Sequence, residues 1–138
     1  MAFWKAGSRA LLGGGFLVTG ITDGLGYKLP TLSSVTQSTN RSTAVTINAL
    51  AGKITTDNTS LAGLATAKFT VTNSKVAVGD VVVASIRSGS DSGGTHVSVT
   101  IVAAGSFQIA VINNNAAAGT AETGAIIINF AVIKAVSA

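Results

Sequence analysis

Residues 96–101 read His-Val-Ser-Val-Thr-Ile and residues 107–111 read Phe-Gln-Ile-Ala-Val, with Ala-Gly-Ser at 104–106 between them. Apolar and polar residues alternate in both runs, which is typical of a strand with one buried face. A glycine in the short connection suits the tight turn of a hairpin. We therefore predict that residues 96–111 form a β-hairpin, and that the domain around it is built from strands.

Two further runs alternate in the same way, with threonines on the other face: residues 44–48, with Val45 and Ile47, and residues 68–72, with Phe69 and Val71. Residues 35–37 and 53–56 are weaker candidates for strands. With these runs the number of predicted strands reaches about eight.

Residues 81–86 and 126–133 are apolar on both faces, reading Val-Val-Val-Ala-Ser-Ile and Ile-Ile-Ile-Asn-Phe-Ala-Val-Ile. Strands of this kind are usually covered on both sides. We therefore expect both to be central in a sheet or to lie at an interface between copies. The predicted oligomer-interface residues are Val81, Val83, Ile86, Ile126, Ile128, Phe130 and Val132.

About eight short strands, separated by turns rich in Gly, Asn, Asp and Ser, predict one all-β domain over residues 35–138, a β-sandwich or a jelly roll. Residues 57–66 could hold one helical turn, and no amphipathic helix of useful length is predicted elsewhere. Residues 1–34 differ in composition, since they hold Trp4, Tyr27, the only proline and seven of the 16 glycines. This segment is predicted to be an extended, glycine-rich N-terminal arm.

Charge is scarce in this chain. Only 10% of its residues are charged and 47% are apolar, whereas about 25% of residues are charged in ordinary soluble domains. Interspersed charge is what normally prevents association, so we predict an obligate oligomer that buries apolar surface against its own copies. The nine basic residues are scattered singly and few aromatic residues accompany them, so nucleic-acid binding is not predicted despite the net charge of +4.

Few residues are available for chemistry: one His, five acidic residues and no Cys. His96 is predicted to be an exposed strand residue. A Ser-His-Asp arrangement that uses it stays open on counting alone, but no Gly-x-Ser-x-Gly motif occurs. Asp57-Asn58 and residues 91–94 have enough oxygen atoms for an incidental calcium ion, although turn formation explains them equally. No catalytic, cofactor or metal site is predicted.

The N-terminal residues partly imitate a secretory signal, since Lys5 and Arg9 precede Ala-Leu-Leu at 10–12. Three consecutive glycines at 13–15 then interrupt the apolar run, so we expect no cleaved leader. No run approaches the ~20 apolar residues that a membrane span requires. Membrane association is not predicted.

Four segments, in this order and spacing, resemble a module that recurs in structural proteins of tailed bacteriophages: residues 69–74, 78–83, 103–107 and 129–134. The module is found in capsid decoration (cement) proteins and in head-fibre or tail-associated proteins. The resemblance covers roughly residues 35–135. It implies a compact β-sandwich, often trimeric, on the outer surface of a virion, and it brings no catalytic residues.

A capsid decoration protein is the function that the resemblance favours. Such a protein forms a homotrimer on the phage head and stabilises the lattice of the major capsid protein or of another virion structural protein. The arm would then attach it to the shell. The candidate docking residues are Phe3, Trp4, Lys5, Arg9, Leu11 and Leu12.

Other functions remain open. A head-fibre or tail-associated knob that binds a receptor or glycan would need aromatic or charged loops, whereas these loops are rich in Gly, Ser, Asn and Ala. A subunit of a bacterial surface structure or pilus would need an export route. An enzyme is the class with the least support in the sequence.

Overall fold

The computed structural model describes residues 9–12, 15–20, 24–27, 33–116 and 120–135. The chain divides into two compact units, Met1–Thr31 and Leu32–Ala138.

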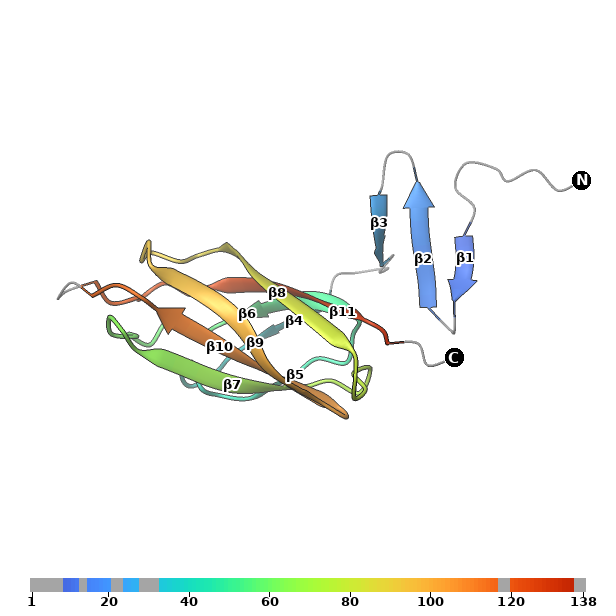
Figure 1. The fold of residues 1–138 in the computed structure, drawn as a ribbon. Helices are drawn as coiled ribbons and strands as arrows, with labels where there is room; N and C mark the ends of the chain where they lie inside the picture. Colours follow the sequence, from blue (N-terminus) through green and yellow to red (C-terminus); the bar gives the residue numbers. More distant parts are fainter. Residues whose placement is uncertain (1–8, 13–14, 21–23, 28–32, 117–119, 136–138) are drawn as a thin grey trace, which may run out of the picture. The chain divides into compact units, whose positions relative to one another are not determined.

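The first unit contains three short strands, β1 (Arg9–Leu12), β2 (Gly15–Gly20) and β3 (Gly24–Tyr27), in an antiparallel sheet of that order (Figure 1). Gly20 pairs with Gly24, so glycines stand where the chain reverses between β2 and β3. The sequence predicted one extended arm over residues 1–34. The described part of this segment is paired instead, because antiparallel neighbours satisfy each other's backbone groups.

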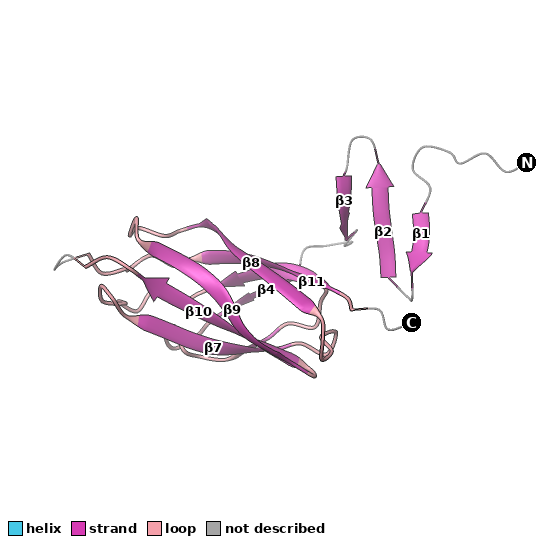
Figure 2. Ribbon diagram, in the orientation of Figure 1, coloured by secondary structure: helices cyan, strands magenta, loops and turns pink. Residues whose placement is uncertain are grey.

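Eight strands build the second unit: β4 (Ser33–Thr36), β5 (Val45–Thr46), β6 (Ala51–Thr55), β7 (Thr66–Thr72), β8 (Val81–Ser88), β9 (Thr95–Ala103), β10 (Ser106–Asn113) and β11 (Ile127–Ile133). They form two four-stranded sheets, with strand orders β5-β7-β10-β9 and β4-β6-β11-β8. The sheets pack against each other, and the described residues contain no helix (Figure 2). The predicted all-β sandwich is confirmed.

Strand direction distinguishes this sandwich from a jelly roll, which is antiparallel throughout. Here the short edge strands β4 and β5 pair in parallel with β6 and β7, and the other pairs in the sandwich are antiparallel. β4 starts at Ser33, so Ser33 and Ser34 belong to the sandwich and not to the segment before it.

The hairpin predicted over residues 96–111 is present as β9 and β10. Gly105 has a φ of +76° in the turn, a conformation that glycine adopts without steric cost. Farther along the hairpin, Gln108 pairs with Ile101 and Ile109 with Val99, so Thr100 is an extra residue in β9. This bulge keeps Val99 and Val102 on the core side.

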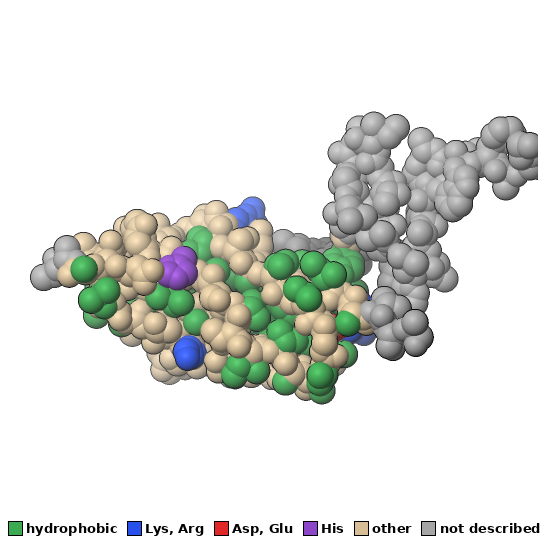
Figure 3. All heavy atoms as spheres, in the orientation of Figure 1, with side chains coloured by type: hydrophobic (Ala, Val, Ile, Leu, Met, Phe, Trp, Pro, Cys, Tyr) green, Lys and Arg blue, Asp and Glu red, His purple; other side chains and the backbone are tan. Residues whose placement is uncertain are grey.

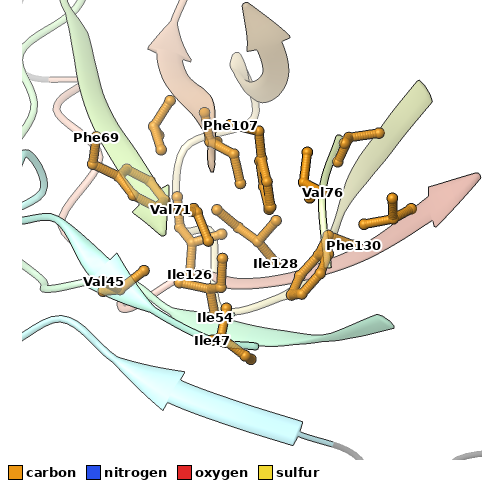
Figure 4. Packing of buried hydrophobic residues seen from close by; sticks show 14 of the residues in the cluster. Val45, Ile47, Ile54, Phe69, Val71, Val76, Phe107, Ile126, Ile128 and Phe130 are labelled. Atoms are coloured by element: carbon orange, nitrogen blue, oxygen red, sulfur yellow. The ribbon is translucent and has the colours of Figure 1, made fainter. Parts of the chain in front are cut away.

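The core lies between the two sheets and follows the alternation along the strands. Figure 4 shows Val71, Phe107 and Ile128 pointing into the space between the sheets. The rings of Phe107 and Phe130, one from each sheet, lie 5.3 Å apart between centroids and are tilted by 49°, a favourable arrangement for an aromatic pair. Phe69, Ile54 and Ile109 are among the largest fully buried side chains. Side chains of both sheets therefore build the core of the sandwich.

Strand β11 is central in its sheet, as its two-sided apolar sequence predicted, but β8 lies at the edge. In β8, Val82 is buried whereas Val81 and Val83 are exposed. Successive side chains of a strand point to opposite faces, and nothing described covers the outer face here. The apolar residues on both faces of this strand therefore did not mean that it has a neighbouring strand on each side.

The helical turn that the sequence allowed within residues 57–66 is absent. Residues 57–65 contain a bridge between Leu61 and Glu122 and a turn at Gly63 and Leu64. The Asp57 carboxylate accepts a hydrogen bond from the Thr59 backbone N–H at 2.7 Å. This local turn competes with helix formation for the same backbone groups.

Candidate functional site

Two clusters of polar residues close the two ends of the sandwich, and an apolar patch lies on its outer surface. The Glu122 end comprises the loops around residues 37–43, 56–65 and 88–95, together with residues 113–116 and 120–126. The Asp80 end comprises the loops around residues 73–80, 104–105 and 134–135.

Glu122 is fully buried at the end that bears its name. Its Oε2 accepts hydrogen bonds from the Ser90 hydroxyl at 2.5 Å and the Ser92 backbone N–H at 3.2 Å. Its Oε1 accepts from the backbone N–H groups of Asp91 at 3.1 Å and Gly124 at 2.9 Å. With four donors the carboxylate is fully occupied, which stabilises a buried charge and attaches the 88–95 loop to the loop before β11.

Arg41 is the buried cation of the same end, with 3% of its surface exposed. Its guanidinium donates to the carbonyl oxygens of Thr59 at 2.6 Å, Glu122 at 3.1 Å and Gly124 at 2.8 Å. It also donates to the Thr56 hydroxyl at 3.2 Å. Burial lowers the pKa of Arg41, and the charges of Glu122, Asp57 and Asp91 oppose that shift. Arg41 therefore joins three loops through their backbones.

Asn113 completes the closure of this end. Its side-chain amide donates to the carbonyl oxygens of Leu61 at 3.1 Å and Thr120 at 2.8 Å, and its Oδ1 accepts from the Ser92 hydroxyl at 3.2 Å. Asp91 lies at the surface, where the Thr123 hydroxyl and backbone N–H donate to its carboxylate. The Thr123 hydroxyl is the main reason that the pKa of Asp91 is well below its ordinary value.

At the opposite end, Asp80 is buried and forms an ion pair with Lys134 at 2.5 Å. Its carboxylate also accepts from the backbone N–H groups of Ala77 at 2.8 Å and Ala135 at 3.0 Å. Burial acts to raise the pKa of Asp80, but the hydrogen bond from Lys134, the two backbone donors and the lysine charge together hold it below its ordinary value. The ion pair connects the loop before β8 to the residues that follow β11.

Neither polar cluster presents a free reactive group. The oxygen atoms of Glu122 and Asp80 are occupied by donors of the chain itself, and His96 is exposed on β9, directly after the 88–95 loop. Within the described ranges, no three His, Cys, Asp or Glu side chains are placed to hold a metal ion, and no helix could span a membrane. The clusters hold loops together.

The outer face of β8 and β11 carries an apolar patch at the Asp80 end. Val81 is paired with Ile133 and Val83 with Ala131 across the two strands, so the four side chains lie together on that face. Val81 is 56%, Val83 48% and Ile133 53% exposed. Figure 3 shows hydrophobic side chains gathered on the surface over these strands. We call these four residues the β8/β11 patch.

The structure divides the predicted oligomer-interface residues into three groups. Ile126, Ile128, Phe130 and Val132 are buried in the domain's own core, so the prediction that they contact another copy is wrong. Ile86 is half-buried against the same core. Only Val81 and Val83 are exposed, and their neighbours Ala131 and Ile133 were not predicted because they alternate with buried residues of β11.

Of the six predicted docking residues, three belong to the described part of the chain. Phe3, Trp4 and Lys5 lie outside the described residues. Arg9, Leu11 and Leu12 belong to β1 and pair through their backbones with β2. Their assignment to the shell stays a prediction.

Comparison of the chain with protein-family models, curated proteins and solved structures gave no match.

Proposed function

We propose that this chain is a capsid decoration protein, which assembles with its own copies on the outer surface of a tailed-phage head and stabilises the shell. The four segments that resemble the phage structural module support this assignment. Two of them, residues 78–83 and 129–134, contribute all four residues of the β8/β11 patch.

The exposed patch is the observation that carries the proposal. The sandwich already has a closed core, so Val81, Val83 and Ile133 are not needed to fill it. Leaving large apolar side chains in water costs free energy, roughly 25 cal/mol for each Å² of apolar surface. Association that covers the patch recovers this free energy, and a protein with few charges has little to oppose it.

A decoration protein acts by adding contact area between shell subunits. When it bridges neighbouring capsomers, its contacts must be broken before those capsomers can separate under the pressure of the packaged DNA. A β-sandwich suits this task when its loops are held firmly, as they are here by Arg41, Glu122 and Asp80.

Electron cryomicroscopy of the phage particle, prepared with and without this chain, tests the proposal. We expect the density of the chain in hundreds of copies at capsomer junctions, and particles without it should release their DNA at a lower temperature. A few tens of copies on fibres or on the tail would contradict a decoration role and would favour the receptor-binding knob. Absence from the purified particle would contradict both.

A further inference from the structure

The β8/β11 patch lies at one end of a sheet face whose middle is polar. Toward the Glu122 end, the same outer face carries Ser85 and Asn129, which are paired with each other, and Lys53 beside them on β6. Arg87 is exposed farther along β8. The apolar part of the face is therefore small and bounded on one side by polar and positively charged residues.

The charges decide which part of the surface can meet an identical surface. Lys53 and Arg87 on this face and Lys68 on the outer face of β7 are all positive, so contacts between copies through those regions bring like charges together. The patch contains no ionisable residue. Lys134, which follows it, is bound to Asp80. Two copies can approach through the patch without this repulsion.

The distribution of exposed apolar residues indicates how the copies meet. Val78 and Ile101, the other exposed large hydrophobics near the Asp80 end, lie on a loop and on the outer face of the second sheet, and Leu64 lies at the Glu122 end. No second group of paired, exposed large hydrophobics occurs on strands β4 to β11. A head-to-tail contact needs two different complementary surfaces, whereas residues that lie close to a two-fold or three-fold axis meet their own counterparts and need only one.

We infer that the β8/β11 patch is the contact between copies of this chain, with the patches of neighbouring copies meeting at a symmetry axis close to Val83. This inference rests on the self-assembly part of the proposed function and says where on the sandwich the copies meet. Near a two-fold or three-fold axis a residue faces its own counterpart, so Val83 of one copy lies beside Val83 of the next.

Cysteine crosslinking tests this geometry directly, because the chain has no cysteine of its own. In the full-length chain, Val83→Cys should form a covalent dimer under mild oxidation, since a disulfide requires the two Cα atoms to lie within about 7 Å. Leu64→Cys is the matched control, because Leu64 is even more exposed, at 70%, and lies at the other end of the sandwich. Equal crosslinking of both variants, or none at position 83, would overturn the inference.

Substitution by a charge tests the energetic role of the same residue. Val83→Asp should raise the dissociation constant of the oligomer on the order of thirtyfold, the effect of losing an interface hot spot, whereas Leu64→Asp should leave it unchanged. Light scattering over a concentration series measures the dissociation constant, and circular dichroism checks that each variant is folded. If the wild-type chain is a monomer at millimolar concentration, the self-assembly part of the proposed function fails as well.

An oligomer that survives Val83→Asp would leave self-assembly in place and would refute only its location. A variant that remains oligomeric but no longer coats particles would assign the patch to the shell protein instead. These results separate the failure of this inference from the failure of the proposed function.

Discussion

Arg41 shows how one side chain can replace secondary structure at the end of a sandwich. Its donors reach the carbonyl oxygens of Thr59, Glu122 and Gly124, which lie in two different loops. Carbonyl groups in loops lack strand partners, and leaving them buried and unpaired is costly. The arginine therefore satisfies backbone groups and fixes the spacing of the loops at the same time.

Replacing Arg41 by Ala should lower the free energy of unfolding by about 3 kcal/mol, because the carbonyl oxygens and the nearby Glu122 charge lose their partner. Urea denaturation followed by fluorescence or circular dichroism measures the change. Arg87→Ala is the control, since Arg87 is exposed and its loss should change stability by less than about 0.5 kcal/mol. Equal effects of the two substitutions would show that the hydrogen bonds of Arg41 add nothing to the free energy of unfolding.

Asp80 gives the sandwich a dependence on pH. The pKa of this carboxyl is lowered in the folded protein, so its contribution to stability is complete above the unfolded pKa of about 3.9 and is lost as the pH falls through the lower, folded value. Asp80→Asn should therefore be less stable than the wild type at pH 7, and the difference should shrink below about pH 4. Urea denaturation at a series of pH values measures this, and a constant difference would contradict it.

Burial of these charged residues could not be predicted from the sequence. Asp, Glu and Arg are normally exposed, and a local pattern does not reveal a partner that lies far away in the chain. Glu122 is bound by Ser90 and Ser92, and Arg41 by the carbonyl oxygen of Glu122, 81 positions later. Only the folded topology brings these loops together.

At the scale of the strand, Gly52 decides how closely β4 approaches β6. A Cβ atom on Gly52 would lie 2.9 Å from the Ser33 carbonyl oxygen, 2.9 Å from the Ile47 side chain and 3.0 Å from the Phe130 ring. Because Gly52 has no Cβ, the Phe130 ring and the backbone of β4 can both lie close to it. Glycine in the middle of a strand often marks such a close approach.

Gly52→Ala should destabilise the domain by about 1–3 kcal/mol, the usual cost of overpacking a core. Gly93→Ala is a suitable control because no heavy atom beyond Gly93 and its two chain neighbours lies within 4 Å of the position its Cβ would take. Thermal unfolding of the two variants gives the comparison. A Gly52→Ala variant that is as stable as Gly93→Ala would show that β4 moves without cost.

The sequence predicted most strands because alternation reports one buried face. The β9–β10 hairpin and β7 followed from it, and the central position of β11 followed from its two-sided apolar sequence. The edge position of β8 did not, because Val81 and Val83 look like core residues when only composition is considered. An apolar strand face gives the same sequence pattern whether it is exposed or buried. The local sequence therefore does not show whether such a face belongs to the core or to an interface.

At the scale of the whole molecule, the sandwich is expected to be independent of the first 31 residues. The chain divides into two compact units, and the sandwich has a hydrophobic core of its own between Val45 and Val132. A chain that lacks residues 1–31 should therefore unfold cooperatively, with a free energy of unfolding within about 0.5 kcal/mol of the full-length value. Urea denaturation of both chains measures the difference.

The same deletion tests the proposed docking role of the N-terminal segment. If Arg9, Leu11 and Leu12 contribute to attachment, the shortened chain should remain an oligomer but no longer bind to particles, as measured by co-sedimentation. Undiminished binding would remove that role from the segment.

The order in which the strands are synthesised determines which sheet of the sandwich can form first. β6 and β8 share no pairing with each other, and both wait for β11, the last strand of the sandwich. The sheet β5-β7-β10-β9 can form during translation, whereas the other sheet must stay open until residue 133 has emerged. Ala131 and Ile133 arrive with that strand, so a half-made chain cannot present the complete contact. Under the proposed self-assembly, association through the patch should therefore begin only after β11 has paired with β8.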